Sequence, residues 1–503
     1  MKKFLALILA TAVLFTLTAC GSGADGNTAE HDENTLTVKV GPISDYDPFN
    51  AYGSDQYDFM NAVYATLIRI SYNSENEPEC VGDLADSYTE ENDGKTLVFH
   101  LKENATFSNG EPITVEDVKF SLETAAASPY QATYCSMIES VEIRDEHTVA
   151  VNITARDDTL PWAWSHVYIV NQAAYEADPS AYSASPVASG AYTLESLDAA
   201  TGNMVLKARE DYWGDAPAIQ TVNLRVINDE QTALISLESG QVDILTTYGM
   251  SATQLSKNDK IVLEEMPNNS MGGVYLNCQV EPWNNVKLRQ AFAYAVDYAA
   301  MRNLLYDGHV GSTSTIPYNS TVDPLPEGIA EYEMNKEKAK QLVAESGVAT
   351  PIDGGAIIGG GSGVGELLQQ YLKEIGIETM VSELGGGDFV TALVSGNFQI
   401  AMIPGAASAI SGGQVLRNSF ATGASSNYGL YSNARVDEIA GEISSVTDKD
   451  RYDELLSEAM TIVADEVPVI SFGLMSYYAA HQQGLHVPTS QNGELYIPGI
   501  YWE

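Results

Sequence analysis

The sequence predicts an α/β protein with more than one domain, and two observations support this. First, the chain has 503 residues, of which 45% are hydrophobic, which is enough for two or three domains with complete cores. Second, residues 212–245 (YWGDAPAIQTVNLRVINDEQTALISLESGQVDIL) follow the pattern of a turn, a strand, a helix and a second strand. Units of this kind are typical of α/β folds.

Each part of residues 212–245 has its own signal. Residues 215–217 form a turn, and residues 221–227 alternate apolar and polar side chains as a strand does. Asp229 supplies a side-chain oxygen for a helix start, and Gly240 stands where a left-handed residue ends a helix. Residues 242–245 then return to apolar side chains, which predicts the second strand.

The overall charge restricts the partners of the chain. There are 68 acidic and 25 basic side chains, so the formal net charge is −43. Such a balance argues against nucleic acid as a partner and against electrostatic adhesion to anionic lipid. It would steer neutral or cationic solutes, although acidity also serves solubility in general.

The N-terminus has the pattern of a secretory signal. Two lysines precede an apolar run of about 15 residues, from Phe4 to Thr18, which is too short for a stable membrane span. The run ends in the letters LTAC, which look like the lipobox of bacterial lipoproteins. We therefore expect a signal peptide at 1–19 and a lipid-anchored flexible tether at 20–35, with Cys20 as the acylated residue. The alternative is an ordinary signal peptide with a coincidental cysteine.

Three further cysteines match no zinc or CxxC spacing. An extracellular location would permit a disulfide, and Cys80 with Cys135 is then the favoured pair, which would leave Cys278 unpaired. Buried free thiols are the alternative.

Regular elements follow from the same patterns elsewhere in the chain. Residues 92–94 (NDG) form a hairpin turn, and Thr114 with Asp117 forms a variant of the capping box at a helix start. Strands are expected at 36–40, 84–88, 97–101, 356–358, 377–381, 398–403 and 468–472, helices at 57–68, 335–347, 366–375 and 451–464, and one long helix from Trp283 to near Gly308.

Several motifs in this order resemble one family. They are the YWG turn with Q-TAL---L-SG-VD in residues 212–245, LADSY, DG, FHL and F-NG-P-T-EDV in residues 78–126, LRQAFAYAVD in residues 288–297, and YSN in residues 431–433. Together they resemble the extracellular substrate-binding proteins of peptide and nickel ABC transporters, solute-binding protein family 5. The resemblance covers about residues 36–480.

The resemblance implies a two-lobed periplasmic-binding-protein fold, type II and cluster C-like, with an extra inserted domain. Such lobes close on a solute by a hinge motion. The implied divisions are lobe I from 36–72, 185–272 and 472–503, an inserted domain at 73–184, and lobe II at 273–471.

The resemblance also implies ligand contacts near the N-terminus. In relatives, a small-residue segment between an Asp-Pro pair and the following helix contacts the ligand. The matching positions here are Tyr52, Gly53, Ser54 and Asp55. A glycine beside hydroxyl and carboxylate groups allows close approach of a ligand to the backbone. A plain strand-to-helix loop is the alternative.

An aromatic stripe follows at residues 160–168. Trp162, Trp164, His166 and Tyr168 are spaced by two, which predicts one face of a strand. Two indoles side by side would form a stacking wall for a solute. The alternative is that the stripe belongs to the core.

The loop after the 398–403 strand departs from the family. Peptide-binding relatives use an Asp there for the peptide's amino terminus, but Ala406 and Ala407 stand at about that place, after Pro404 and Gly405. The tyrosine-aspartate-proline-histidine run of nickel-binding relatives is absent, and the Arg that some dipeptide binders use for a carboxylate has no counterpart. Backbone-mediated recognition, or an uncharged or modified ligand, is therefore expected. The family's tyrosine turn adds Tyr428 as a candidate contact.

The glycine-rich loop at 359–365 is a further candidate contact. A loop of this kind before a helix is a general anion site, but GGGSGVG lacks the lysine of a P-loop and fits no GxGxxG spacing. A tight or flexible turn is the alternative.

No enzymatic motif stands out. The seven histidines form no HExxH, and neither GxSxG nor CxxC occurs, so we expect no catalysis, no cofactor and no metal. The sequence predicts a monomeric lipoprotein on the outer face of the cytoplasmic membrane that delivers an oligopeptide or peptide-like solute to an ABC permease. The alternatives are a binding protein for a metallophore, an opine or a saccharide-like solute, and a lipid-anchored sensor without a transport role.

Overall fold

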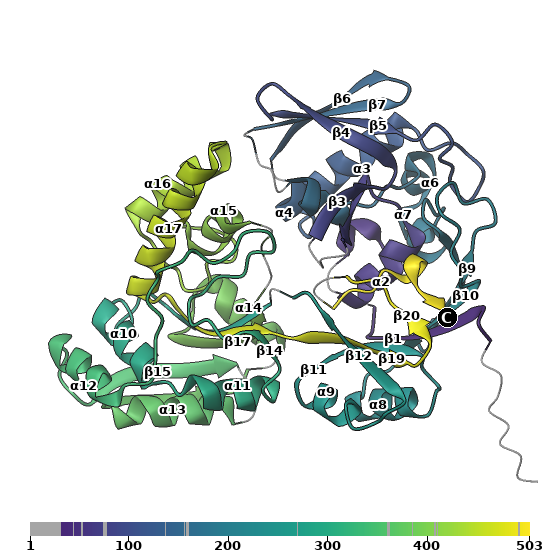
Figure 1. The fold of residues 1–503 in the computed structure, drawn as a ribbon. Coiled ribbons are helices and arrows are strands. Elements are labelled where there is room, and N and C mark those ends of the chain that lie inside the picture. The colour runs from purple at the N-terminus through teal and green to yellow at the C-terminus, as the bar shows by residue number, and fades with distance from the viewer. Residues whose placement is uncertain are drawn as a thin grey trace, which may run out of the picture.

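The structure, a computed structural model of the chain, describes residues 32–43, 45–51, 54–73, 78–135, 137–154, 156, 160–268, 270–359, 363–384, 386–406, 409, 411–490 and 493–503. The predicted signal peptide and Cys20 lie outside the described residues. Two large sheets organise the rest, and Figure 1 shows them in two separate parts of the molecule. None of the described helices combines the length and apolar character that crossing a membrane requires.

A seven-stranded sheet forms the basis of the first part, which we call lobe I. Its middle strand β1 pairs in parallel with β10 on one side and with β11 on the other, and Val38 faces Leu224 and Ile244. The strands in spatial order are β12 (Ile261–Met266), β19 (Tyr477–Gln482), β11 (Ile244–Tyr248), β1 (Thr35–Val40), β10 (Thr221–Val226), β9 (Met204–Ala208) and β8 (Tyr192–Leu197).

A six-stranded sheet forms the basis of the second part, which we call lobe II. Here β13 runs antiparallel between β17 and β18, while β15 is parallel to both β16 and β17. The strands in spatial order are β14 (Val310–Ser312), β18 (Val469–Met475), β13 (Met271–Leu276), β17 (Ile400–Ala406), β15 (Ile352–Gly359) and β16 (Ile377–Ser382).

Helices cover both faces of the lobe II sheet, because successive strand residues point to opposite sides. Ile357 joins the core on one face and Ile358 the core on the other. The helices of the first face are α10 (Val286–Ala295), α11 (Tyr298–Tyr306), α12 (Lys336–Glu345) and α13 (Val364–Glu374). Those of the second face are α14 (Gly386–Ser395), α15 (Gly412–Val415), η3 (Leu416–Phe420), α16 (Ala434–Glu442), η4 (Ile443–Ser445) and α17 (Lys449–Glu466).

The lobe I sheet is also covered on both faces. On one face Ala480 packs with α8 (Glu230–Glu238) and α9 (Gly249–Leu255), while the neighbouring Ala479 joins a larger core on the other face. That larger core also contains α2 (Ser54–Val63) and residues of the C-terminal segment. The remaining elements there are η1 (Pro48–Asn50), β20 (Leu485–His486), η5 (Ile497–Gly499) and β21 (Tyr501–Trp502).

Residues 68–184 add a four-stranded sheet that shares this larger core. Phe99 of β5 and Val118 of α3 belong to the same buried cluster as Val38 of β1. The predicted inserted domain at 73–184 therefore packs continuously with lobe I. Its elements are β2 (Ile68–Tyr72), β3 (Pro78–Gly82), β4 (Ala85–Glu91), β5 (Thr96–Leu101), α3 (Val115–Ala127), α4 (Ala132–Cys135), β6 (Ile138–Asp145), β7 (Thr148–Ile153), α5 (Leu160–Ala163), η2 (Trp164–His166), α6 (Gln172–Ala177) and α7 (Pro179–Ala184).

Two neighbouring connections cross between the lobes (Figure 1). β12 of lobe I leads to β13 of lobe II through a short segment that contains Asn268 and Ser270, and β18 of lobe II leads to β19 of lobe I through Ser476. The connections bind one another, because Asn268 Nδ2 donates to the carbonyl oxygen of Met475 at 2.6 Å. The chain thus returns to lobe I after Met475.

Several local predictions are confirmed. The strand, helix and strand of residues 221–245 are β10, α8 and β11, and Asp229 caps α8 by accepting from the amide of Thr232 at 2.8 Å. Gly240 has a φ of +74°. The capping box at Thr114 is complete, because Asp117 accepts from the Thr114 amide at 2.9 Å and returns its own amide to the Thr114 hydroxyl.

The long helix predicted from Trp283 to near Gly308 is wrong, since the structure has two helices, α10 and α11. Val296 between them is extended, with φ −76° and ψ 134°. The carboxylate of Asp297 accepts from the amide of Ala300 at 3.0 Å, which starts a new helix. Aspartate competes for the backbone in this way and favours caps over helix interiors. The helix predicted at 57–68 likewise ends earlier, at Val63.

The disulfide is not formed. Cys80, Cys135 and Cys278 are all free thiols, of which Cys135 is buried and the other two are half-buried. Burial raises the pKa of Cys80 and of Cys135 to about 12. Thiols with such pKa values are almost fully protonated at neutral pH and react slowly.

Candidate functional site

A cavity of about 320 Å³ lies between the two lobes. Trp162 of α5 lines it from the lobe I side, and the other lining residues belong to lobe II. Those that carry polar or charged groups toward it include Asp323, Ser411, Arg417, Lys449 and Tyr452. Because its walls belong to different lobes, the width of this cavity depends on how the lobes are oriented.

The lobe II wall is held by a hydrogen-bond network around Asp323. One carboxylate oxygen of Asp323 accepts from the amide of Gly412 at 2.8 Å and from the Tyr452 hydroxyl at 2.7 Å. The Tyr452 hydroxyl in turn accepts from the amide of Gly413 at 2.9 Å. Burial and the bond to Asp323 raise the pKa of Tyr452. The network joins the start of α15 to Tyr452 in the first turn of α17 through Asp323.

The two tryptophans predicted to lie side by side have different environments. The strand interpretation is wrong, because residues 160–163 form the short helix α5 and residues 164–166 the 3₁₀ helix η2. Trp164 is fully buried, packs against Phe99 with ring centroids 5.8 Å apart, and donates to the carbonyl oxygen of Tyr134. Only Trp162 lines the cavity between the lobes.

The N-terminal candidate segment is described in part. Tyr52 and Gly53 lie outside the described residues, and Ser54 is the first residue of α2. The carboxylate of Asp55 accepts from the amide of Gly41 at 2.6 Å, which ties the start of α2 to the chain just after β1. Asp55 thus has a structural partner in lobe I.

The candidate loop predicted to begin at 404 starts later, because β17 continues to Ala406 and pairs there with Met271. Pro404 and Gly405 are exposed, and the Pro404 carbonyl oxygen accepts from the Tyr306 hydroxyl at 3.0 Å. A β-carbon at Gly405 would lie 2.5 Å from the Ser270 hydroxyl oxygen, so the backbone packs tightly here. Ala406 pairs with Met271, and Ala407 lies outside the described residues.

Tyr428 lies elsewhere on lobe II. Its ring meets that of Tyr275 edge to face, with centroids 5.7 Å apart, and both line a small pocket with Met271. Met271 is also the strand partner of Ala406, so Tyr428 lies near the end of β17 rather than beside Trp162. The candidate residues therefore do not share one site: Asp55 lies at the start of α2, Trp162 at the cavity between the lobes, and Tyr428 near the end of β17.

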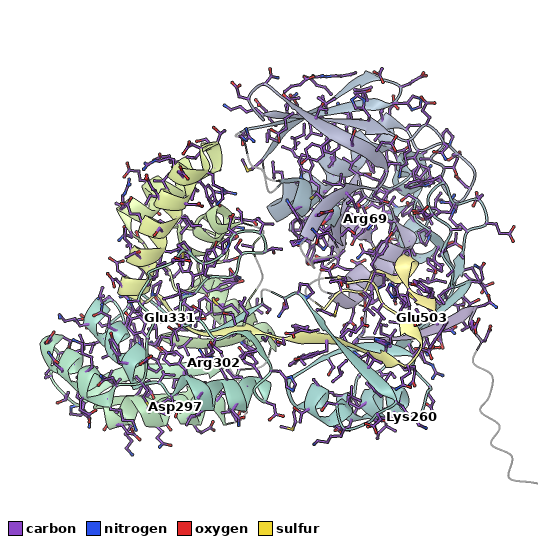
Figure 2. All side chains as sticks on the ribbon, viewed as in Figure 1. Arg69, Lys260, Asp297, Arg302, Glu331 and Glu503 are labelled. Carbon is purple, nitrogen blue, oxygen red and sulfur yellow. The ribbon has the colours of Figure 1, made fainter. Side chains whose placement is uncertain are left out.

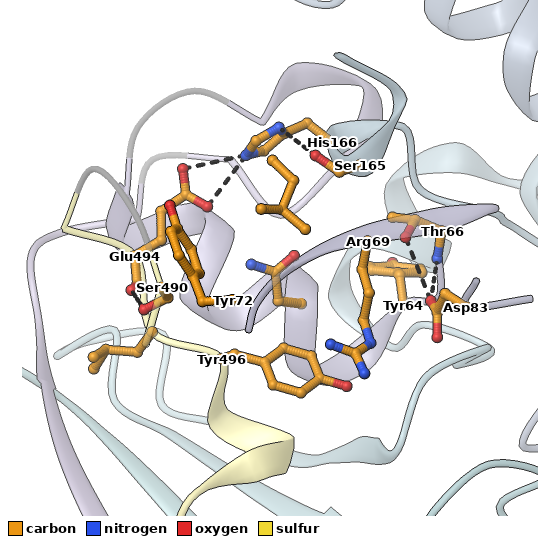
Figure 3. Close-up of a pocket in the computed structure, with 13 residues that line it drawn as sticks. Tyr64, Thr66, Arg69, Tyr72, Asp83, Ser165, His166, Ser490, Glu494 and Tyr496 are labelled. Carbon is orange, nitrogen blue, oxygen red and sulfur yellow. Dashed lines mark hydrogen bonds and ion pairs between the residues drawn. The ribbon is translucent and has the colours of Figure 1, made fainter. Parts of the chain in front are cut away.

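A second, smaller cavity of about 60 Å³ lies in lobe I beside the first (Figure 3). The turn formed by α5 and η2 separates the two, because Trp162 lines the first while Ser165 and His166 line the second. The opposite walls of the second cavity come from β2 and from the C-terminal segment, with Arg69 and Tyr496 among them.

A buried ion pair closes one end of this second cavity. Nε2 of His166 lies 3.2 Å from both carboxylate oxygens of Glu494, and each side chain is 13% exposed. The rings of Tyr57 and Tyr134 flank the imidazole at 4.6 and 5.6 Å. Burial alone would lower the pKa of His166, but the charge of Glu494 and its hydrogen bond outweigh this and raise the pKa above its ordinary value of 6.5.

The Asp58 carboxylate is a further buried acid on this side. It is buried and accepts from the amide of Leu495 at 2.6 Å, so that α2 and the C-terminal segment are joined next to Glu494. Burial raises the pKa of Asp58 well above its ordinary range.

Sequence reasoning missed Arg69, His166, Glu494 and Tyr496 as residues of one cavity. His166 and Glu494 are 328 positions apart, and no local pattern relates them. The only local signal was the period-two stripe that contained His166.

Residues 360–362, the middle of the glycine-rich loop, fall outside the described residues. Among the residues that the structure describes, no group of three or more His, Cys, Asp or Glu side chains is placed to hold a metal ion.

The comparison with protein families is decisive at this point. The family described as bacterial extracellular solute-binding proteins, family 5 Middle, matches residues 79–427. The chain belongs to this family. Its members are binding proteins of the extracellular or periplasmic space, and the resemblance inferred from the sequence motifs is confirmed.

Individual relatives agree with the family. The chain is 26% identical over 387 residues to heme-binding protein A of Haemophilus influenzae, which covers 69% of each chain. It is 22% identical over 437 residues to the dipeptide-binding protein of Escherichia coli, covering 78% of this chain and 80% of that one. The oligopeptide-binding protein AppA of Bacillus subtilis, solved with a nonapeptide, superposes with a TM-score of 0.76 at 20% identity, over 93% of this chain and 99% of that one. The two-lobed periplasmic-binding-protein fold is thus confirmed.

The different environments of the two tryptophans predict different costs of truncation. Trp164→Ala should lower the free energy of unfolding by about 3–5 kcal/mol, because it leaves a cavity in the core. Trp162→Ala should cost about 1 kcal/mol or less, because its side chain borders a cavity already. Urea unfolding followed by circular dichroism measures both. Equal losses in the two variants would contradict this assignment.

The His166–Glu494 pair predicts a pH dependence of stability. Because the pKa of His166 is raised in the folded state, the stabilisation is complete below about pH 6.5 and is lost as the pH rises through the raised pKa. The difference in unfolding free energy between the wild type and His166→Gln should therefore be larger at pH 5.5 than at pH 9. His147→Gln, in the turn between β6 and β7, is the control and should show no such trend. A histidine titration by NMR that gives His166 a pKa below 6.5 would refute the prediction.

Proposed function

We propose that this protein captures an oligopeptide or peptide-like solute between its lobes and delivers it to the permease of an ABC importer. The observation that carries the proposal is the cavity lined by Trp162 from lobe I and by lobe II residues such as Tyr452. A solute held there would touch both lobes at once. Such contacts favour the closed arrangement, because a ligand shifts the equilibrium toward the state in which it makes more contacts.

The chemistry of the walls supports a peptide-like ligand. Trp162 offers an apolar aromatic surface, and Ser411 and Tyr452 on the opposite wall carry hydroxyl groups that can bind the peptide groups of a ligand. The relatives named for dipeptides and the structure with a nonapeptide point in the same direction. Within this proposal, Tyr52, Gly53, Ser54, Ala407 and Tyr428 remain candidate contacts.

A non-peptide solute is the second candidate. The relative from Haemophilus influenzae is named for heme, so the family fold does not by itself select peptides. The absence of the aspartate of peptide-binding relatives at Ala406 and Ala407 favours this alternative as well.

Native mass spectrometry of the full chain carrying Cys20→Ser would test the solute class. We expect a spread of species at peptide masses to be released on mild denaturation, because recognition through backbone groups tolerates many side chains. Trp162→Ala should retain less of this material than the parent, and Trp213→Phe, outside the cavity, should retain as much. A single non-peptide mass would replace the peptide assignment and leave the binding class intact.

We also propose that Cys20 carries the lipid anchor, with the chain acting as a monomer on the outer face of the cytoplasmic membrane. The support is the lysine-led apolar run ending in LTAC at Cys20. In a bacterial host fed labelled palmitate, the wild type and Cys80→Ser should incorporate label, whereas Cys20→Ser should not. Equal label in Cys20→Ser would refute the anchor.

A further inference from the structure

The smaller cavity in lobe I contains a guanidinium without a protein acceptor. The side chain of Arg69 on β2 makes no hydrogen bond or ion pair with any residue that the structure describes, and its guanidinium carbon lies over the ring of Tyr496, 5.0 Å from the ring centroid (Figure 3). Other partly or fully buried arginines are satisfied differently: Arg302 donates to the carbonyl oxygen of Phe472 and Arg289 to that of Glu466. Figure 2 shows Arg69 in lobe I and Arg302 in lobe II.

The position of Arg69 suits recognition of a planar anion. Stacking on Tyr496 holds one face of the guanidinium, which leaves the N–H groups at its edge for an acceptor. A guanidinium edge matches the two oxygens of a carboxylate in a bidentate pair. The contact with the ring thus orients the guanidinium without engaging any of its N–H donors.

A second donor in the same cavity lacks an acceptor. The Oδ1 atom of Asn61 accepts from the Tyr168 hydroxyl at 3.1 Å, while its Nδ2 group has no acceptor among the described residues. Asn61 and Arg69 both line the cavity, so it contains donors from two separate elements, α2 and β2.

The acidic groups of the cavity are already engaged. Both oxygens of Glu494 face Nε2 of His166, and one oxygen of Asp83 accepts from the amide of Thr66 at 2.8 Å. Asp83 is close enough for Arg69 to act on its pKa, yet the two form no ion pair within 4.0 Å. Both carboxylates thus have a partner within the protein, whereas the Arg69 and Asn61 side-chain donors have none among the described residues.

The size of the cavity fits a small group. Its volume of about 60 Å³ compares with about 10–15 Å³ needed for one water on the same scale. A carboxylate group fits, whereas a whole peptide does not. Residues of the α5–η2 turn line both cavities, Trp162 the one between the lobes and Ser165 and His166 this one.

We propose that Arg69 and Asn61 form a subsite for a carboxylate of the solute, an inference that rests on the proposed function. The carboxylate is either the C-terminus of a peptide or an acidic side chain. Some dipeptide-binding relatives use an Arg for a carboxylate of the ligand, and that Arg has no counterpart in this sequence. The subsite supplies a positive partner for the carboxylate from lobe I instead.

The test compares matched peptides on four proteins: the wild type, Arg69→Gln, Arg69→Lys and the control Arg144→Gln, whose arginine pairs with Glu91 on the surface. The probes are alanine peptides of two to nine residues with free or amidated C-termini, and the same peptides with one Asp or Asn. Calorimetry should show about tenfold tighter binding of one carboxylate form over its neutral counterpart in the wild type and in Arg144→Gln. Arg69→Gln should lose this preference, and Arg69→Lys should keep part of it, because lysine lacks the bidentate edge.

A second measurement does not depend on peptides. In ¹H–¹⁵N spectra of arginine side chains, the Nε–H signal absent from Arg69→Lys should shift saturably with acetate, and not with acetamide or sodium chloride. Arg69→Gln that binds with unchanged carboxylate preference would overturn the subsite and leave the proposed function standing. Failure of every peptide to bind, with the acetate shift present, would overturn the peptide assignment and support the subsite. Absence of the acetate shift would overturn the subsite in either case.

Discussion

The two-strand crossing between the lobes is the constraint on which the rest of the structure depends. β12 and β19 pair within the lobe I sheet, and β13 and β18, which continue them, pair within the lobe II sheet. The crossing is tied on both sides, because Met475 donates its amide to the Ser270 carbonyl oxygen and Ser476 donates its hydroxyl to Glu265. His309, which follows α11, adds a further contact between the lobes, because its ring nitrogens lie 2.8 Å from the Thr253 hydroxyl and 3.0 Å from the Tyr478 hydroxyl of lobe I. A cavity lined from both lobes follows from this arrangement.

Much of the fold could be predicted because its signals are local. The cap at Asp229, the stop at Gly240 and the capping box at Thr114 each depend on residues within four positions of one another. The family motifs cover the same local units, and so they identified the fold. The break of the long helix also had a local signal, the aspartate at position 297, but the apolar pattern of its neighbours on both sides continued through it.

The candidate site was less predictable, because its residues meet only through tertiary packing. A spacing of two between Trp162 and Trp164 fits a strand, yet it also fits a short helix that turns into a 3₁₀ segment, where such residues point in different directions. Whether an indole belongs to the core or lines a cavity depends on which side chains pack against it. For Trp164 this is Phe99, which comes from a sheet far away in the chain. The pairs His166–Glu494 and Arg69–Tyr496 depend on the last residues of the chain folding back against the start of lobe I.

The acidity of the chain makes a guanidinium without a carboxylate partner unusual in this protein. With 68 acidic and 25 basic side chains, acceptors are in excess almost everywhere, and a cation at the surface readily finds a carboxylate, as Arg144 and Arg435 do. A guanidinium without a carboxylate partner requires that the neighbouring carboxylates bind other groups. At Arg69 the neighbouring acids are engaged by Thr66 and His166, and the ring of Tyr496 occupies its face. In such a protein an anionic group of a solute can bind at a cation with which no carboxylate of the protein pairs, even though the net charge is strongly negative.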